Sequence, residues 1–324
     1  MSPSDDVRIG LVGAGGVGER HARVLSGIPG VTIAGVADPD PRRAASLASR
    51  HGALTLPDAR ALVDAVRPDA LYVCVPPFAR GDPEMVAVEH GLPLFVEKPL
   101  AADLATAERL GAAITEAGLV TGTGYHWRCL DTVQHARELL ADRSPGLVAA
   151  RWFDKVPPPT WWPSATGSGG QVVEQATHLI DLIRYVVGEI RSVAADGARN
   201  GHCPPPADID ESSAALLRLA SGGVGTLTAT CLAPDKHSAV LDVAAPGLAV
   251  TISEDRLVVH DRNGVHDLRP RVDARTAVDE DFIGLVRGCP STTVVPYAEA
   301  IRTHRVACAI ATSSRDRRPV DLDL

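Results

Sequence analysis

A glycine-rich turn near the start of the chain constrains the fold more than any other feature of the sequence. Residues 13–18 read Gly-Ala-Gly-Gly-Val-Gly, an intact G-x-G-x-x-G that follows the apolar run Val7–Val12 and leads into a helical pattern. Glycines in this spacing permit a tight turn, let backbone amides approach a pyrophosphate and allow the helix to pack on the strand. The pattern predicts a strand-turn-helix unit that binds a dinucleotide through Gly13, Gly15, Gly16, Val17 and Gly18.

A carboxylate stands where such a site would contact the adenosine ribose. The next apolar run, Val31–Val36, leads into Asp38, which follows Gly18 by about 20 residues. An acid there accepts hydrogen bonds from the ribose hydroxyls and repels a 2′-phosphate. We therefore expect NAD as the cofactor. NADP stays possible because Arg42 and Arg43 follow within one turn.

Short apolar runs and helical segments alternate through residue 122, in the order typical of a parallel sheet covered by helices. Strands are predicted at Val7–Val12, Val31–Val36, Ala70–Val75, Leu94–Val96 and Leu119–Thr121. Helices are predicted at Val17–Leu25, Pro41–His51, Ala59–Val66, Pro83–His90 and Asp103–Ala117. Because nearly continuous apolar strands are buried on both faces, residues 1–122 are expected to form a doubly wound α/β domain.

The pattern changes in residues 123–324, which are predicted to form an α+β domain with an open, mainly antiparallel sheet. Helices are expected at Asp131–Ala141, about Val172 to Val187, Val278–Arg287 and Tyr297–Ser313. Strands joined by short turns are expected at Leu147–Phe153, Ser213–Leu219, Gly223–Cys231, Ala239–Ala244, Leu248–Ile252 and Arg256–Val259. A loop rich in proline, tryptophan and glycine spans residues 156–170.

Composition narrows the class of partner. A chain of 324 residues corresponds to roughly two domains, and its net charge of −8 disfavours binding to nucleic acid or to an anionic membrane. No apolar run is long enough to cross a membrane, and the acidic amino terminus differs from a secretory signal. Six scattered cysteines without a C-x-x-C pair suggest no metal site. We expect a cytoplasmic protein that acts on small molecules.

Three further segments carry a family resemblance. The first is Glu97-Lys98-Pro99 after the fourth strand, and the second is the Gly-Tyr-His-Trp-Arg run at residues 124–128. The third is residues 169–181, which contain Glu174, His178 and Asp181. With the glycine turn, they make the chain resemble the Gfo/Idh/MocA family of sugar and cyclitol dehydrogenases over nearly its whole length. The resemblance implies a Rossmann domain and a second domain whose open sheet borders the active site and commonly mediates homodimers or homotetramers.

The resemblance also implies roles for single residues. Lys98 matches the lysine of the family's E-K-P motif, and His178 matches the catalytic histidine. Glu174 replaces the aspartate found four residues before that histidine, and Val75-Pro76-Pro77 lacks an asparagine common in relatives. The resemblance suggests that Val75, Pro76 and Glu97 contribute to the cofactor site. It suggests that Tyr125, His126 and Arg128 enter the substrate site.

The residues themselves support part of this assignment. Glu174, His178 and Asp181 are spaced to share one helical face, and a carboxylate one turn away can orient an imidazole. We expect His178 to act as the base and Lys98 to hydrogen-bond the reacting oxygen. Glu174 is expected to bind a neighbouring hydroxyl or to hold His178. Lys98 and His178 are expected to meet in one pocket beside the nicotinamide.

The predicted activity is reversible oxidation of a secondary hydroxyl of a sugar, cyclitol or related polyol. Trp161 and Trp162 either offer an aromatic face to the substrate or serve ordinary packing. Three other activities remain open. They are an NAD-dependent glycosidase that uses transient oxidation, an imine or double-bond reductase, and a non-catalytic NAD(H) sensor.

Overall fold

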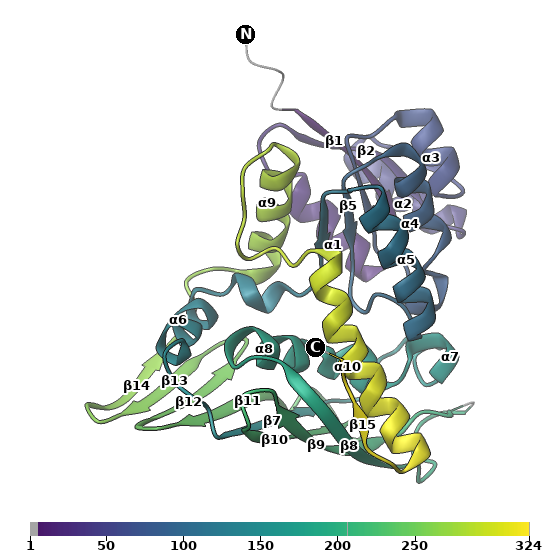
Figure 1. Cartoon of the computed structure of the whole chain (residues 1–324). Helices are drawn as coiled ribbons and strands as arrows, with labels where there is room; N and C mark the ends of the chain where they lie inside the picture. The colour runs from purple at the N-terminus through teal and green to yellow at the C-terminus, as the bar shows by residue number, and fades with distance from the viewer. Residues whose placement is uncertain (1–5, 206, 324) are drawn as a thin grey trace. The chain divides into compact units, whose positions relative to one another are not determined.

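The computed structural model describes residues 6–205 and 207–323, which group into two compact units (Figure 1). The first unit comprises the chain up to Ala101, Ala105–His126 and Arg275–Ile301. The second comprises Ala102–Leu104, Trp127–Ala274 and the chain from Arg302 onward. The division at residue 122 predicted from the sequence assigns residues 275–301 to the second half, whereas the contacts group them with the first unit.

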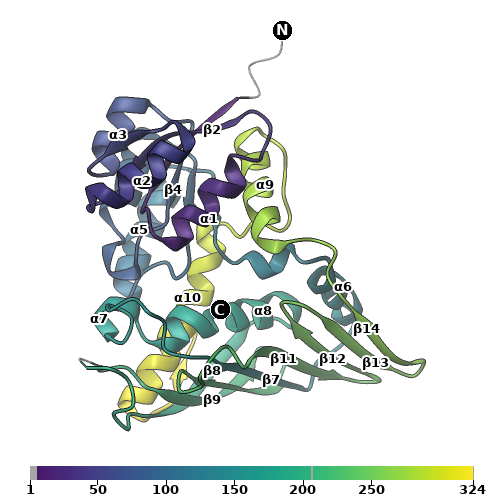
Figure 2. The same ribbon diagram turned by 180° about the vertical axis from the view of Figure 1, so that it is seen from behind.

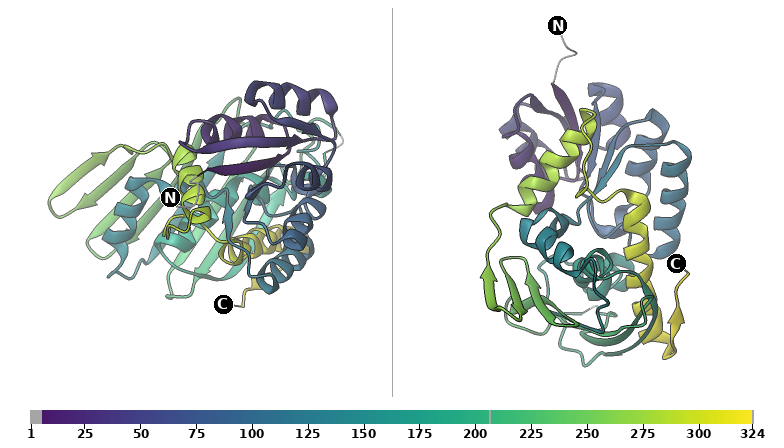
Figure 3. Two further views of the ribbon diagram at one scale, coloured as in Figure 1. Left: turned by 90° about the horizontal axis from the view of Figure 1, so that it is seen from above. Right: turned by 60° about the vertical axis from the view of Figure 1, so that its left-hand side comes forward.

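A sheet of six parallel strands forms the centre of the first unit. Its purple amino-terminal strands lie beside purple and blue helices in Figure 3. The strand order β3-β2-β1-β4-β5-β6 is that of a doubly wound dinucleotide-binding domain, which confirms the predicted fold. The strands are β1 Val7–Val12, β2 Val31–Ala37, β3 Leu54–Leu56, β4 Ala70–Val73, β5 Leu94–Val96 and β6 Thr121–Thr123. The sequence patterns missed only β3 in this sheet, since its Leu-Thr-Leu stretch is largely exposed and forms no continuous apolar run.

Helices cover this sheet, and several begin at the expected signals. They are α1 Gly16–Leu25, α2 Pro41–His51, α3 Ala59–Val66, α4 Asp82–His90, α5 Leu104–Glu116 and α9 Ala274–Val286, with a short 3-10 turn at Pro77–Ala79. The Asp40 side chain accepts from the amide of Arg42 at the start of α2, and Asp58 accepts from the amide of Ala61 at the start of α3. Such caps satisfy backbone amides that the helix itself leaves unpaired.

The second unit contains a nine-stranded mixed sheet in the order β14-β13-β12-β11-β7-β10-β9-β8-β15. Its strands are β7 Leu147–Phe153, β8 Ile190–Ala198, β9 Ser212–Leu219, β10 Val224–Thr230, β11 Ser238–Ala245, β12 Leu248–Ser253, β13 Leu257–Asp261, β14 Gly264–Leu268 and β15 Val320–Asp321. The mainly antiparallel sheet is confirmed, but β7 and β10 pair in parallel. The strands β8, β14 and β15 were not predicted.

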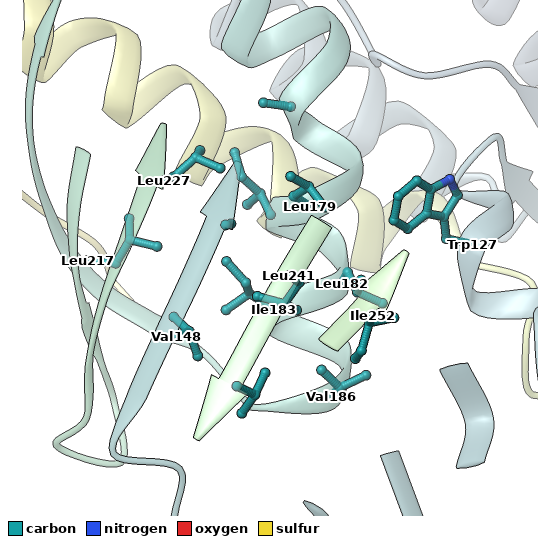
Figure 4. Close-up of a cluster of buried hydrophobic side chains, with 14 of the residues drawn as sticks. Trp127, Val148, Leu179, Leu182, Ile183, Val186, Leu217, Leu227, Leu241 and Ile252 are labelled. Carbon is teal, nitrogen blue, oxygen red and sulfur yellow. The ribbon is translucent and has the colours of Figure 1, made fainter. Parts of the chain in front are cut away.

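Helices pack on one face of this sheet. They are α6 Asp131–Leu140, α8 Thr177–Val186 and the part of α10 (Tyr297–Asp316) beyond Ile301, with a single turn α7 at Ala165–Ser168 and a 3-10 turn at His126–Cys129. Figure 4 shows α8 directing apolar side chains, among them Leu182 and Ile183, toward the strands. The facing side chains include Val148, Leu217 and Leu241. This layer positions the second set of candidate site residues.

The helix predicted from about Val172 to Val187 is confirmed, but its first turn is not a regular α-helix. Residues Val172–Ala176 form a π-helical turn, and the regular α8 begins only at Thr177. A π turn changes which side chains share a face, so the simple i, i+4 relation of Glu174 and His178 does not describe their placement. No helix among the described residues is long and apolar enough to cross a membrane.

The packing of α8 predicts the effect of a cavity. Ile183→Ala should destabilise the protein by about 2–5 kcal/mol, because Ile183 is fully buried against the sheet. Thermal and urea unfolding followed by circular dichroism measure the change. Val265→Ala on the exposed strand β14 is the control and should change stability little. Equal losses in both variants would contradict this account of the core.

Candidate active site

The glycines of the turn after β1 fall into two groups. Gly13 has a φ of 101°, and a Cβ there would lie 2.7 Å from the carbonyl oxygen of Cys74. A Cβ at Gly18 would clash with the carbonyl oxygen of Gly13. The fold itself therefore requires glycine at both positions, because α1 and β4 approach the turn so closely.

Packing within the protein does not require glycine at positions 15 and 16. No heavy atom lies within 4 Å of a Cβ built at either position, and Gly15 is the N-cap residue of α1. The space therefore lies at a helix amino terminus, where backbone amides and the helix dipole favour an anion. Val17, which follows, is exposed. This open space at the amino terminus of α1, which we call the cradle, fits the pyrophosphate of a dinucleotide.

Asp38 follows the end of β2 and is tied to the glycine turn. Its Oδ2 accepts a hydrogen bond from the amide of Ala14 at 2.8 Å, and its Oδ1 accepts from the amide of Asp40 at 2.9 Å. These bonds hold the carboxylate beside the turn, as contact with a ribose requires. Arg42 and Arg43 are exposed, and Arg43 pairs with Asp40. Val75 and Pro76 are partly buried after β4, next to the Cys74 backbone that abuts Gly13.

Glu97, directly after β5, lies in a buried cluster of charged groups. Its Oε1 accepts from Arg20 at 2.8 Å and contacts His21 Nε2 at 2.9 Å. Burial by itself would raise the pKa of Glu97, but the His21 hydrogen bond and the Arg20 charge bring that pKa well below its usual range. The carboxylate is therefore ionised although water hardly reaches it.

Lys98 follows Glu97 directly and is partly buried. Its backbone amide donates to Glu97 Oε2 at 2.9 Å. Gly124 packs against the same carboxylate, since a Cβ at Gly124 would lie 2.6 Å from Glu97 Cδ. The Glu97 side chain thus shapes the turn that carries Lys98. Of the next residues, Tyr125 is buried in the core of the first unit, and His126 Nδ1 lies 3.3 Å from the carbonyl oxygen of Gly124.

His178 lies on α8 in the second unit, beside two indole rings whose own centroids are 6.3 Å apart. Its ring centroid is 6.2 Å from that of Trp127 and 5.9 Å from that of Trp152, with interplanar angles of 14° and 18°. The side chain is 6% exposed. The stacked rings restrict the orientation of the imidazole, as a residue that moves a proton requires.

Glu174, in the π turn, is held by one of the two loop tryptophans. The indole Nε1 of Trp162 donates to Glu174 Oε2 at 2.8 Å. Trp162 is buried in a small cluster with Cys203, Ile209 and Cys231, and Trp161 packs against this cluster. Trp162 therefore packs inside the protein, and its indole holds the carboxylate of Glu174 in place.

Arg128 and Asp181 form a buried ion pair in the second unit. The guanidinium donates to both carboxylate oxygens, at 2.8 and 2.6 Å, and lies 4.5 Å from the ring centroid of Tyr185. Thr303 also donates to Asp181, at 3.0 Å. Arg128, expected at the substrate, is thus engaged in anchoring α8. Sequence reasoning placed Asp181 on the helix face but gave no sign of this partner.

The candidate residues belong to different units. The glycine turn, Asp38, Val75, Pro76, Glu97, Lys98, Tyr125 and His126 lie in the first unit, and Arg128, Trp161, Trp162, Glu174 and His178 lie in the second. Sequence reasoning missed His21 and Asp279 beside Glu97. His21 stands three residues after the last glycine of the turn, which is a usable signal, whereas nothing local marks Asp279.

Comparison with known proteins agrees with this geometry. Residues 7–125 match the family described as "Oxidoreductase family, NAD-binding Rossmann fold", and residues 133–260 match the "GFO/IDH/MocA C-terminal domain". The chain belongs to the Gfo/Idh/MocA family of oxidoreductases. Its first unit is an NAD-binding Rossmann domain, which confirms the expected family, enzyme class and cofactor.

Named relatives include dehydrogenases of cyclitols and sugars. The scyllo-inositol 2-dehydrogenase (NAD(+)) of Bacillus subtilis is 25% identical over 98% of this chain and 97% of its own length. The myo-inositol dehydrogenase Hyg17 of Streptomyces leeuwenhoekii is 30% identical over 68% of this chain and 69% of its own. A structure of levoglucosan dehydrogenase with NADH and levoglucosan has the same fold, with a TM-score of 0.89 at 20% identity, covering 98% of this chain and 100% of that one.

The two groups of glycines predict two kinds of defect. Gly15→Ala should leave the melting temperature nearly unchanged but weaken NADH binding about tenfold or more, because the methyl group enters the cofactor's space. Gly18→Ala should lower the melting temperature, because its Cβ meets the Gly13 carbonyl. NADH fluorescence titration and thermal unfolding separate the two effects. Normal NADH affinity in Gly15→Ala would contradict the cradle.

Proposed function

We propose that this protein reversibly oxidises a secondary hydroxyl of a sugar, cyclitol or related polyol, with NAD as hydride acceptor. The observation that carries the proposal is the position of Lys98. It is the second residue after β5, at the carboxyl end of a parallel strand in an NAD-binding domain, where ligands of doubly wound sheets bind. The named cyclitol and sugar dehydrogenases among the relatives support the substrate class.

In this mechanism Lys98 donates a hydrogen bond to the reacting oxygen of the substrate. Its ammonium stabilises the negative charge that develops as the hydroxyl loses its proton. NAD, when bound, supplies the hydride-accepting nicotinamide. The Glu97 carboxylate, ionised and fastened to the amide of Lys98, holds the turn while the ammonium acts.

His178 is proposed to accept the hydroxyl proton. A neutral imidazole has a suitable basicity near neutrality, and the neighbouring Trp127 and Trp152 rings limit its rotation. Glu174, oriented by the Trp162 indole, is proposed to bind a neighbouring substrate hydroxyl. His126 and Trp161 are proposed to line the substrate, whereas Tyr125 supports His126 from the core of the first unit. Arg128 contributes through the ion pair that anchors α8.

Lys98 and His178 are proposed to act on one substrate, and a double-mutant cycle tests this. Lys98→Ala and His178→Ala should each lower kcat about 100-fold, and the double variant should lose much less than the product of the two. The assay follows NADH formation with inositols, aldoses and levoglucosan, with NAD and NADP in parallel. Net NADH formation also separates a dehydrogenase from a glycosidase that recycles its cofactor.

The surface variant Arg60→Ala is the control for this cycle. Arg60 pairs with Glu89 on the exposed side of the first unit, so its loss should leave kcat unchanged. Near-normal turnover in Lys98→Ala would refute the catalytic role of Lys98. Fully multiplicative losses would refute the expected coupling between Lys98 and His178.

We also propose that the protein works as a homodimer or homotetramer in the cytoplasm. Support for assembly comes from the second unit's sheet. Leu147 on β7, Leu216 on β9 and Val224 on β10 are exposed on one sheet face, since Val224 pairs with Leu147 and Leu216 pairs with Thr226, two residues along from Val224. Exposed apolar side chains gathered on one face are typical of an interface.

A charge on this sheet face should break the assembly. Leu216→Glu is expected to shift the mass measured by size-exclusion chromatography with light scattering toward that of the 34.0 kDa chain, because a buried unpaired carboxylate is costly. Leu54→Glu, at an equally exposed position of the first unit, should leave the mass unchanged. A wild-type protein that elutes as a monomer would refute the proposal.

A further inference from the structure

A fully buried histidine in the first unit bridges two carboxylates. His21 is 0% exposed. Its Nδ1 lies 2.7 and 2.9 Å from the two carboxylate oxygens of Asp279, and its Nε2 lies 2.9 Å from Glu97 Oε1. With both ring nitrogens facing carboxylates, the arrangement suits an imidazolium that donates at each end.

This bridge joins three segments that are distant in the sequence. His21 lies on α1, within one turn of the cofactor glycines. Glu97 directly follows β5, and Asp279 lies on α9, 258 residues after His21. Figure 2 shows α9 beside α1, in agreement with the bond between them. The second oxygen of Glu97 accepts from the amide of Lys98. A continuous chain of contacts therefore runs from Asp279 to the Lys98 turn.

The charges in the cluster favour the protonated histidine. Burial would lower the pKa of His21, but the Asp279 charge and hydrogen bond, reinforced by Glu97, raise it to about 9. Other titratable or charged groups around the cluster are Arg20 of α1, Tyr72 of β4, Cys74, Arg80 and Lys98. Two cations, Arg20 and His21, thus balance the carboxylates of Glu97 and Asp279.

We propose that His21 and Asp279 are positioning residues for Lys98, acting through Glu97 to set the geometry and the charge of the turn that carries the lysine. This role deepens the proposed function and rests on it for its catalytic purpose. A buried ion pair is seldom a net gain in stability over apolar packing, and it can instead specify a single arrangement. Here the ion pairs would specify how α1, which follows the glycine turn, meets the turn that carries Lys98.

Loss of the His21 charge should change the electrostatic environment and the backbone hydrogen bond of Lys98. Without the imidazolium, Glu97 loses one of its two side-chain partners, and the cluster gains a net negative charge beside Lys98. The bond from the Lys98 amide to Glu97 should then loosen. Because His21 loses its proton as the pH passes about 9, the wild-type protein itself should undergo this change at that pH.

Lysine labelling makes the linkage observable without a substrate. The chain has three lysines, Lys98, Lys155 and Lys236, so a protein labelled with ¹³C,¹⁵N-lysine gives few signals. Each is assigned by its loss in a Lys→Arg variant. Lys155 is a matched internal control, because its amide also donates to the carboxylate of the preceding residue, Asp154, at 2.8 Å.

The expected result is a step in the Lys98 ε-carbon shift centred near pH 9, with no such step for Lys155. His21→Gln should abolish the step and speed amide exchange of Lys98 several-fold at pH 7, leaving Lys155 unchanged. Asp279→Asn should move the step to lower pH, since Asp279 raises the His21 pKa. His90→Gln, which removes an exposed histidine near Asp64, should retain the wild-type step.

Activity adds a second readout. His21→Gln should lower kcat about tenfold while the NADH dissociation constant stays within twofold, because the cofactor glycines are unchanged. A missing step at Lys98, a step that survives His21→Gln, or equal changes at Lys98 and Lys155 would overturn the linkage. If His21→Gln does not fold, the wild-type titration and Asp279→Asn decide the question. Full activity of Lys98→Ala would instead overturn the proposed function, with the linkage judged by its own signals.

Discussion

The close approach of the glycine turn to its neighbours is the constraint on which the first unit depends. Gly18 packs so tightly on the Gly13 carbonyl, and Gly13 on the Cys74 backbone, that no side chain fits at either position. This contact sets α1 directly against the strands. It presents the helix amino terminus to the cofactor space, and it places His21 at the end of β5.

Charge burial then organises what surrounds the cofactor space. A carboxylate as buried as Glu97 is stable only when it is paired and hydrogen-bonded. Arg20, His21 and the Lys98 amide meet that requirement, and Gly124 leaves room for the side chain. Because the buried Glu97 carboxylate must be paired, its bond to the Lys98 amide fixes the course of the backbone at Lys98.

The second unit holds its candidate residues by different means. Two tryptophan rings pack beside His178, and another tryptophan donates to Glu174, so aromatic packing takes the place of the charge cluster. The ion pair of Arg128 with Asp181 fastens α8. The π turn before α8 reorients Glu174 relative to a regular helix. Rigid supports of this kind suit residues that must align a hydroxyl for hydride transfer.

Local patterns were informative where a single stretch of chain decides the outcome. The glycine turn, the capping residues Asp40 and Asp58, and strands such as β1, β5 and β7 could be recognised from sequence, because sterics and periodicity act within a few residues. The π turn, the short strand β3 and the exposed strand β14 could not, since their apolar pattern is too short or too weak. The candidate residues Lys98, Glu174 and His178 came from motif positions rather than from physical deduction.

The class of fold, the dinucleotide turn and the acidic residue beside it follow from the amino-acid sequence, because each depends on neighbours along the chain. Three pairings follow only from the packed fold: Asp279 with His21, Asp181 with Arg128, and Trp162 with Glu174. The parallel pairing of β7 with β10 also follows only from the packed fold. These outcomes depend on which distant segments share the same buried space, and the cost of leaving a buried charge or backbone group unpaired selects among them.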